Sequence, residues 1–144
     1  MSLTQREITD KAQKYLHMKL GKKKRKAIAW KLMRMCHELG VTVSFAFHEI
    51  DDRGEYAHGD FDSTEKHITI YKSIKSSDVT TLDLFTLSHE YIHAIQFDEG
   101  MEPDAWMYYA DMMFEKPKRA CSRLERDADS RAVELLDNLI ATSP

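Results

Sequence analysis

Two histidines and a glutamate stand in the pattern His89-Glu90-Tyr91-Ile92-His93. On a helix, residues four apart lie about one turn apart on the same face, so both imidazoles can reach one ion. Zinc accepts imidazole nitrogen, and its catalytic sites usually combine three protein ligands with a water. Glu90 falls beside the histidine pair, where a carboxylate can take a proton from a water activated by the metal. The pattern therefore predicts a zinc site with His89 and His93 as ligands and Glu90 as general base.

A third protein ligand has to come from another segment. No histidine follows His93 in the chain, so a ligand from the C-terminal half must be a carboxylate. Glu125 and Asp129 are four residues apart and share one face of an expected helix. Two small residues near them, Ala128 and Ala132, permit close contact with a neighbouring helix. An ordinary charged helix face is the alternative interpretation, and the other groups that could complete the site are Asp98, Glu99, Asp104 and His67.

The histidine pair followed by this acidic helix resembles the gluzincin metallopeptidases. In that superfamily a glutamate on a later helix completes the zinc site, and an aspartate four residues on orients the first histidine. The resemblance implies that Glu125 is the third ligand and that Asp129 orients His89. The run from Glu125 to Leu136 is also similar to small bacterial and phage metallopeptidases of the ImmA/IrrE type, although Arg131 stands where these usually have an aromatic residue.

The elements that carry these residues follow from hydrophobic periodicity and end signals. Thr80 and Asp83 have the spacing of a capping box at the start of the helix that carries the motif. Helices are expected over about 4–20, 22–39, 80–97, 104–114 and 119–140, and strands over 41–47, 55–61 and 66–71. The expected fold is α+β, mainly helical with a small antiparallel sheet, as in a minimal zincin-like metallopeptidase domain. A substrate strand could lie along an exposed sheet edge, for which 66–71 is the candidate.

Composition predicts a single folded domain over residues 1–144. The net charge of −3 hides an asymmetry, because residues 1–40 form a basic helical part with 11 lysines and arginines against 3 acidic residues. The run from Lys22 to Lys26 could meet phosphates or an acidic partner, although a solvated helix start is the simpler interpretation. Two distant cysteines, Cys36 and Cys121, and the lack of a long apolar run predict a cytoplasmic protein without membrane contact.

The favoured hypothesis is a zinc hydrolase that acts on a protein or peptide, with Zn2+ as cofactor. The rival is a zinc-stabilised regulatory or binding module that contacts nucleic acid or an acidic partner through residues 1–40. Nucleic acid is the less favoured partner. The sequence carries no signal for an oligomeric state.

Overall fold

The computed structural model describes residues 4–47, 59–72, 78–100 and 119–143. The elements in chain order are α1 (Gln5–His17), α2 (Lys22–Glu38), β1 (Thr42–Phe47), β2 (Gly59–Asp62), β3 (His67–Lys72), α3 (Thr81–Asp98) and α5 (Arg119–Thr142). The helices expected over these segments are confirmed, and the helix expected over 104–114 lies outside the described residues. Among the described helices, none is long and apolar enough to cross a membrane.

Side-chain caps set where α1 and α3 begin. The hydroxyl of Thr80 accepts the backbone N–H of Asp83 at 3.0 Å, and the carboxylate of Asp83 accepts the backbone N–H of Thr80 at 3.0 Å. Thr4 and Glu7 form the same reciprocal pair at the start of α1. Each pair satisfies backbone donors that a helix start leaves free. The capping box predicted at Thr80 is therefore confirmed.

The three strands form one mixed sheet in the order β1-β3-β2. β2 and β3 pair antiparallel through the turn at 63–66, whereas β1 pairs parallel with β3. The α+β class and the mainly helical content are confirmed, but the expectation of an antiparallel sheet was wrong for the β1–β3 pair. Alternating polarity identifies a strand without naming its neighbour, and here β3 returns between β1 and β2. The strand proposed as an exposed edge is for the same reason the central one, and among the described strands β1 and β2 are the outer ones.

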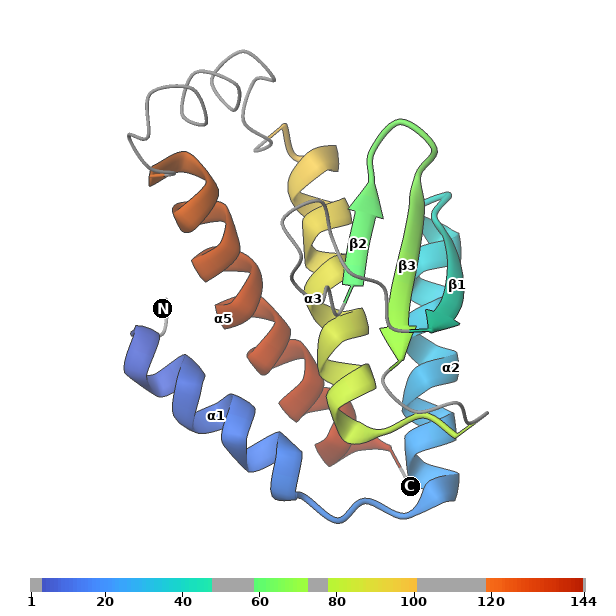
Figure 1. Ribbon diagram of the computed structural model, residues 1–144. Coiled ribbons are helices and arrows are strands. Elements are labelled where there is room, and N and C mark those ends of the chain that lie inside the picture. Colours follow the sequence, from blue (N-terminus) through green and yellow to red (C-terminus); the bar gives the residue numbers. More distant parts are fainter. Residues whose placement is uncertain (1–3, 48–58, 73–77, 101–118, 144) are drawn as a thin grey trace.

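Helix α3 lies at the centre of the molecule. It packs against α1, α2 and α5 and against β2 and β3, with the sheet on one side and α5 on the other (Figure 1). Its apolar residues Leu84, Leu87, Ile92 and Ala94 are buried. Helix α5 meets α3 through Ala128, Ala132 and Leu136 among others, and all three are fully buried. Polar groups on α3 are therefore held in largely enclosed surroundings, where each needs a partner.

One residue of the basic run has a structural role. Arg25 donates from its guanidinium to the backbone carbonyls of Leu20 and Val79, the latter at 2.7 Å, and it pairs with Asp78 at 2.7 Å. These contacts tie the connection between α1 and α2 to the segment that enters α3. Lys22, Lys23 and Lys26 are exposed. The simple interpretation of the whole run as a solvated helix start therefore does not hold for Arg25.

Candidate metal centre

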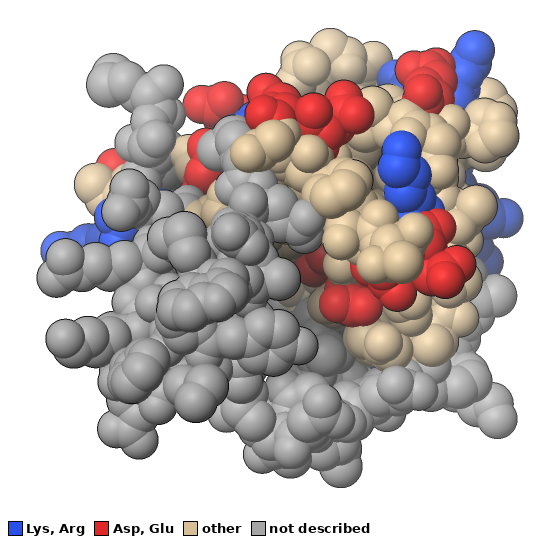
Figure 2. All heavy atoms as spheres, turned by 90° about the horizontal axis from the view of Figure 1, so that it is seen from above, with Lys and Arg blue, Asp and Glu red and all other residues tan. Residues whose placement is uncertain are grey.

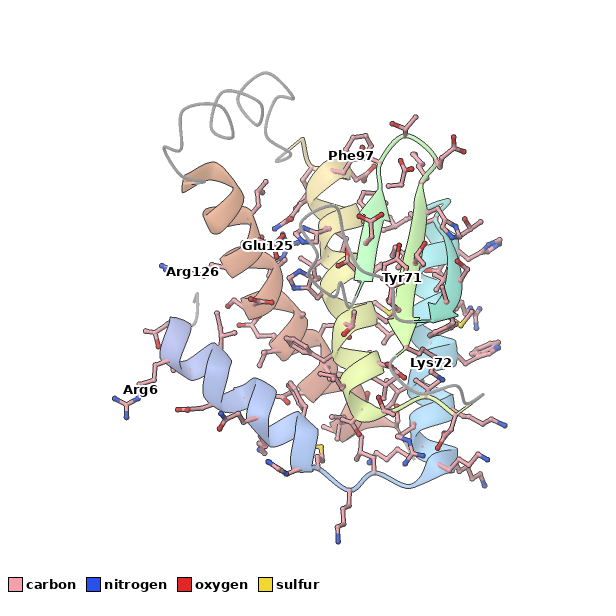
Figure 3. The ribbon with its side chains drawn as sticks, viewed as in Figure 1. Arg6, Tyr71, Lys72, Phe97, Glu125 and Arg126 are labelled. Carbon is pink, nitrogen blue, oxygen red and sulfur yellow. The ribbon has the colours of Figure 1, made fainter. Side chains whose placement is uncertain are left out.

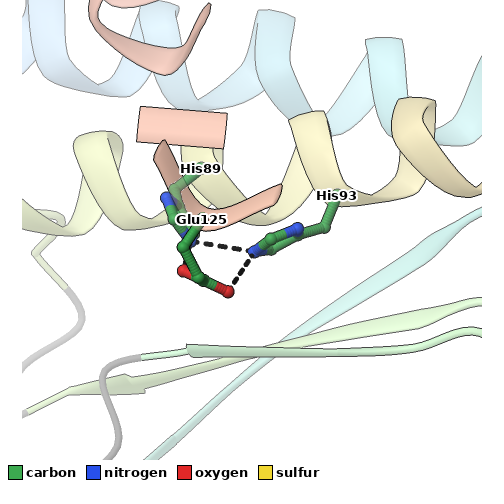
Figure 4. A group of neighbouring side chains, drawn as sticks. All are labelled: His89, His93 and Glu125. Atoms are coloured by element: carbon green, nitrogen blue, oxygen red, sulfur yellow. Dashed lines mark hydrogen bonds and ion pairs between the residues drawn. The ribbon is translucent and has the colours of Figure 1, made fainter. Parts of the chain in front are cut away.

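Helices α3 and α5 bring His89, His93 and Glu125 together (Figure 4). The two Nε2 atoms lie 3.0 Å apart. Oε2 of Glu125 lies 3.0 Å from Nε2 of His89, and Oε1 lies 3.0 Å from Nε2 of His93. Glu125 points from α5 toward α3, whereas its neighbour Arg126 points away from it (Figure 3). Three atoms of the kinds that bind metals therefore converge on one point.

The other nitrogen of each imidazole already has a partner. Nδ1 of His89 lies 2.7 Å from Oδ1 of Asp129, and Nδ1 of His93 lies 2.8 Å from Oε1 of Gln96. The amide oxygen of Gln96 can only accept a hydrogen bond, so Nδ1 of His93 carries the hydrogen. The contact of His89 with Asp129 is an ion-pair contact rather than a hydrogen bond of regular geometry, and the carboxylate at 2.7 Å likewise favours a proton on Nδ1 of His89. Each Nε2 is then the atom left to bind a cation. This is the usual arrangement of metal-binding histidines, in which an outer acceptor selects the nitrogen that faces the metal.

The electrostatics of the cluster favour a cation. Burial disfavours the imidazolium of His89, but the contacts with Asp129 and Glu125 outweigh it and raise the pKa of His89 to about 10. Burial would likewise lower the pKa of His93, yet Glu125 raises it. Burial acts to raise the pKa of Glu125, but the two histidines hold it well below its ordinary range. Protons on both Nε2 atoms would repel each other across 3.0 Å, whereas one divalent ion can serve all three groups.

The separations and donor types fit zinc. Ligand atoms held tetrahedrally at about 2.0–2.1 Å from zinc lie about 3.3 Å from one another. The contacts that join His89, His93 and Glu125 are each 3.0 Å, so an expansion of a few tenths of an ångström would seat the ion. Two imidazoles and one carboxylate are a donor set of catalytic zinc sites, which leave the fourth position open.

Glu90 lies beside this cluster and against the sheet. Its side chain is buried, and a Cβ added to Gly59 of β2 would lie 3.3 Å from its Oε1. Burial raises the pKa of Glu90 to about 7, with part of the effect offset by the charges of His89 and His93. Glu90 is not among the ligand atoms that converge. A carboxylate with this pKa can exchange a proton near neutral pH.

The alternative third ligands lie elsewhere or outside the described residues. His67 faces β1, where its ring nitrogens contact the hydroxyls of Thr42 at 2.6 Å and Ser44 at 2.7 Å. Glu99 pairs with Arg131 at 3.0 Å. Asp98 is exposed at the end of α3, and Asp104 is outside the described residues. None of the described alternatives joins the cluster of His89, His93 and Glu125.

Sequence reasoning missed two residues that shape the site. Gln96 follows His93 by three residues on the same helix face, a spacing that could have identified it as a partner of that ring. Gly59 allows β2 to approach α3, because an added Cβ would lie 2.7 Å from Cγ2 of Thr86 and 3.0 Å from Cγ of Glu90. No local pattern marks Gly59, since the close approach joins segments far apart in the chain.

On the described surface around the end of α3 and the β2–β3 turn, acidic side chains outnumber basic ones, although Lys66 of the turn is exposed as well. Figure 2 shows acidic side chains gathered on this face with few basic ones among them. Asp62, Glu65, Asp98 and Glu99 are exposed in these segments. Such a field raises the local concentration of cations near the cluster.

Comparison with known proteins yields no match: no family model, no curated protein and no solved structure matches the chain.

Proposed function

We propose that this chain is a zinc-dependent hydrolase of the gluzincin type, acting on a protein or peptide. The observation that carries the proposal is the convergence of His89 Nε2, His93 Nε2 and a Glu125 carboxylate at mutual contacts of 3.0 Å. Asp129 and Gln96 occupy the outward nitrogens of the two rings, which leaves both Nε2 atoms for one ion. A cytoplasmic location, expected from the cysteines, stays part of this proposal.

Each residue has a separate task in the proposed reaction. Zinc, when bound, supplies a Lewis acid that polarises a carbonyl and makes water more acidic. His89, His93 and Glu125 hold the ion, and Asp129 keeps His89 in the required tautomer. Glu90 accepts the proton of the attacking water and returns it to the leaving nitrogen. Its buried position beside the ligands places it where it can make both transfers.

The edge of β2 is the favoured place for a substrate strand. β2 pairs with β3 on one side, and no described strand pairs with its other edge. Gly59 places the start of β2 against Glu90. An extended peptide added at this edge would pass beside the general base, which is how strand addition presents a backbone for recognition. The edge of β2 takes the place of residues 66–71 as the candidate, because those residues belong to the central strand β3.

Zinc titration with matched variants tests the metal site. The purified chain should bind one zinc, measured by competition with a chromogenic chelator. Glu125→Ala removes a ligand and should lose tight binding, whereas Arg126→Ala, which changes the neighbouring residue that points away, should bind as the parent does. Equal affinities of parent and Glu125→Ala would remove Glu125 from the site, and a parent without zinc binding would remove the metal.

Cleavage of an unbiased peptide library tests the reaction. The zinc-loaded parent should cleave, and Glu90→Gln should keep the metal while losing about 10²- to 10⁴-fold in rate, the usual contribution of a general base. Glu134→Gln, an exposed change on α5, serves as the control and should leave the rate unaltered. Unchanged cleavage by Glu90→Gln would rule out the proposed role of Glu90.

A second candidate function rests on the outer face of α2. Trp30 is 62% exposed there, with the guanidinium carbon of Arg34 5.5 Å from its ring centre. Lys23 and Lys26 are exposed on the same helix. A cationic helix with an open indole favours a zinc-stabilised module that binds a single-stranded nucleic acid. Salt-sensitive binding of an oligonucleotide, lost in Trp30→Ala, together with no peptide cleavage by the parent, would favour this alternative.

A further inference from the structure

Gln96 joins the two helices that carry the site. Its side chain is almost fully buried, at 2% exposure. Its Oε1 lies 2.8 Å from Nδ1 of His93, and its Nε2 donates to the carbonyl of Leu124 at 3.0 Å and to Oδ2 of Asp127 at 2.8 Å. The first contact lies within α3 and the other two reach α5. Both N–H groups and one lone pair of the amide oxygen are therefore used at the site itself.

The chemistry of these partners fixes which way the amide points. The carbonyl of Leu124 and the carboxylate of Asp127 can only accept, so the NH₂ group must face them. The amide oxygen is then forced toward His93, whose Nδ1 must donate. Nε2 of His93 is left with its lone pair toward the cluster. The tautomer of His93 thus follows from acceptors on the other helix.

The same amide also sets the position of Glu125. Leu124 immediately precedes Glu125, so the hydrogen bond to its carbonyl holds the backbone at the start of the ligand-bearing turn. Asp127 is held in turn by Arg131, whose guanidinium lies 3.3 Å from Asp127 and 3.0 Å from Glu99. Arg131, which departs from the aromatic residue of the ImmA/IrrE type, therefore supports this connection between the C-terminal end of α3 and the first half of α5.

We propose that Gln96 is a positioning residue of the zinc site, which selects the metal-binding nitrogen of His93 and holds Glu125 in register with it. This inference rests on the proposed function. It assigns Gln96 no contact with substrate or metal. Loss of its amide should weaken the metal site while the packing of α3 against the core persists.

The test compares Gln96→Leu, which keeps much of the volume but makes none of the three hydrogen bonds, with Ser88→Ala. Ser88 is fully buried on the same helix, and its hydroxyl donates to Leu84 O at 2.8 Å, away from the ligands. Gln96→Leu should raise the zinc Kd about 10- to 100-fold, the usual effect of removing a group that orients a ligand. Ser88→Ala should bind zinc as the parent does.

A spectroscopic readout separates positioning from general destabilisation. In the zinc-loaded parent, the Nδ1 proton of His93 should be visible by NMR and slow to exchange, because Gln96 accepts it. The signal should be lost from Gln96→Leu and kept in Ser88→Ala. Equal zinc affinities of Gln96→Leu and the parent would overturn this inference and leave the proposed function standing. An equal loss of zinc affinity in Gln96→Leu and Ser88→Ala would do the same. A parent that binds no zinc would overturn the proposed function and this inference together.

Hydrogen-bond polarity provides a test if Gln96→Leu does not fold. Gln96→Glu keeps an acceptor for His93 but turns a carboxylate toward two acceptors on α5, so zinc binding should weaken. Adding Asp127→Asn offers an amide donor in that place. The double variant should bind zinc more tightly than Gln96→Glu alone. A double variant no better than Gln96→Glu would contradict the proposed polarity.

Discussion

The approach of β2 to α3 at Gly59 can be tested by adding one methyl group. In Gly59→Ala the new Cβ would lie 2.7 Å from Cγ2 of Thr86 and 3.0 Å from Cγ of Glu90. Carbon atoms in good contact are about 3.5–4.0 Å apart, so β2 or the side chains of Thr86 and Glu90 must shift by about 1 Å at this point. Overpacking of this kind costs about 1–3 kcal/mol. We expect Gly59→Ala to destabilise the fold by that amount.

The same displacement should affect the proposed reaction. Glu90 is one of the two side chains that the methyl group pushes, and a misplacement of about 1 Å in a reacting group can cost about 10²-fold in rate. Thr86→Ser removes the nearer clash while keeping the hydroxyl that donates to Leu82 O at 3.1 Å. In the Thr86→Ser background, Gly59→Ala should cost at least about 1 kcal/mol less, yet the rate should stay low because Glu90 is still crowded.

Urea unfolding followed by circular dichroism measures the four free energies of this double-mutant cycle, and peptide cleavage gives the rates. Gly21→Ala is the control, since a Cβ there meets nothing within 4 Å. It should change stability by less than about 1 kcal/mol. A Gly59→Ala protein as stable as the parent, or a cycle without coupling between positions 59 and 86, would refute the close approach of β2 to α3.

Two further predictions concern stability. Arg25→Gln loses the contacts to Val79 and Asp78 and should lower the free energy of unfolding by about 2 kcal/mol. The control Lys23→Gln, an exposed change in the same run, should alter it by less than about 0.5 kcal/mol. Urea unfolding measures both values, and equal effects would contradict the structural role of Arg25. Burial acts to raise the pKa of Asp137, but hydrogen bonds from Tyr15 at 2.6 Å and Lys11 at 2.9 Å hold it below its ordinary value. The stability contributed by this depressed pKa is fully present above the ordinary aspartate pKa of about 3.9 and is lost as pH falls through the lower folded value. The stability difference between parent and Asp137→Asn should therefore shrink as pH is lowered from 6 to 3, and a constant difference would contradict the assigned partners.

The helices and the groups on them were predictable from local signals. The capping box at Thr80 and the run of apolar residues after it defined α3, and the spacing of His89 and His93 placed both rings on one face of it. These features depend on contacts within a few residues, where sequence and geometry are directly linked. The facing of Glu125 and Asp129 on α5 followed from the same periodicity.

Pairings between distant segments were decided only by the tertiary structure. Strand signals identified β1 and β3 but not their parallel pairing, because alternation records which face is buried and says nothing of the neighbouring strand. Arg25 looked like one more solvated cation until the tertiary structure placed the Val79 carbonyl and the Asp78 carboxylate, both just ahead of α3, beside it. Local sequence therefore determined which segments form helices and strands, whereas the tertiary structure determined which segments pack or pair with one another.

The candidate site likewise combines features that the sequence determines with contacts that depend on the tertiary structure. The sequence by itself determined the chemistry that α3 and α5 could offer, since imidazoles and carboxylates at helical spacing face one way whatever surrounds them. Only the packed structure decided that Glu125 meets both Nε2 atoms at 3.0 Å and that Gln96 reaches from His93 across to α5. The reason is physical: the distance between two helices depends on every side chain packed between them, here small residues such as Ala128 and Ala132, and that sum is a property of the whole core.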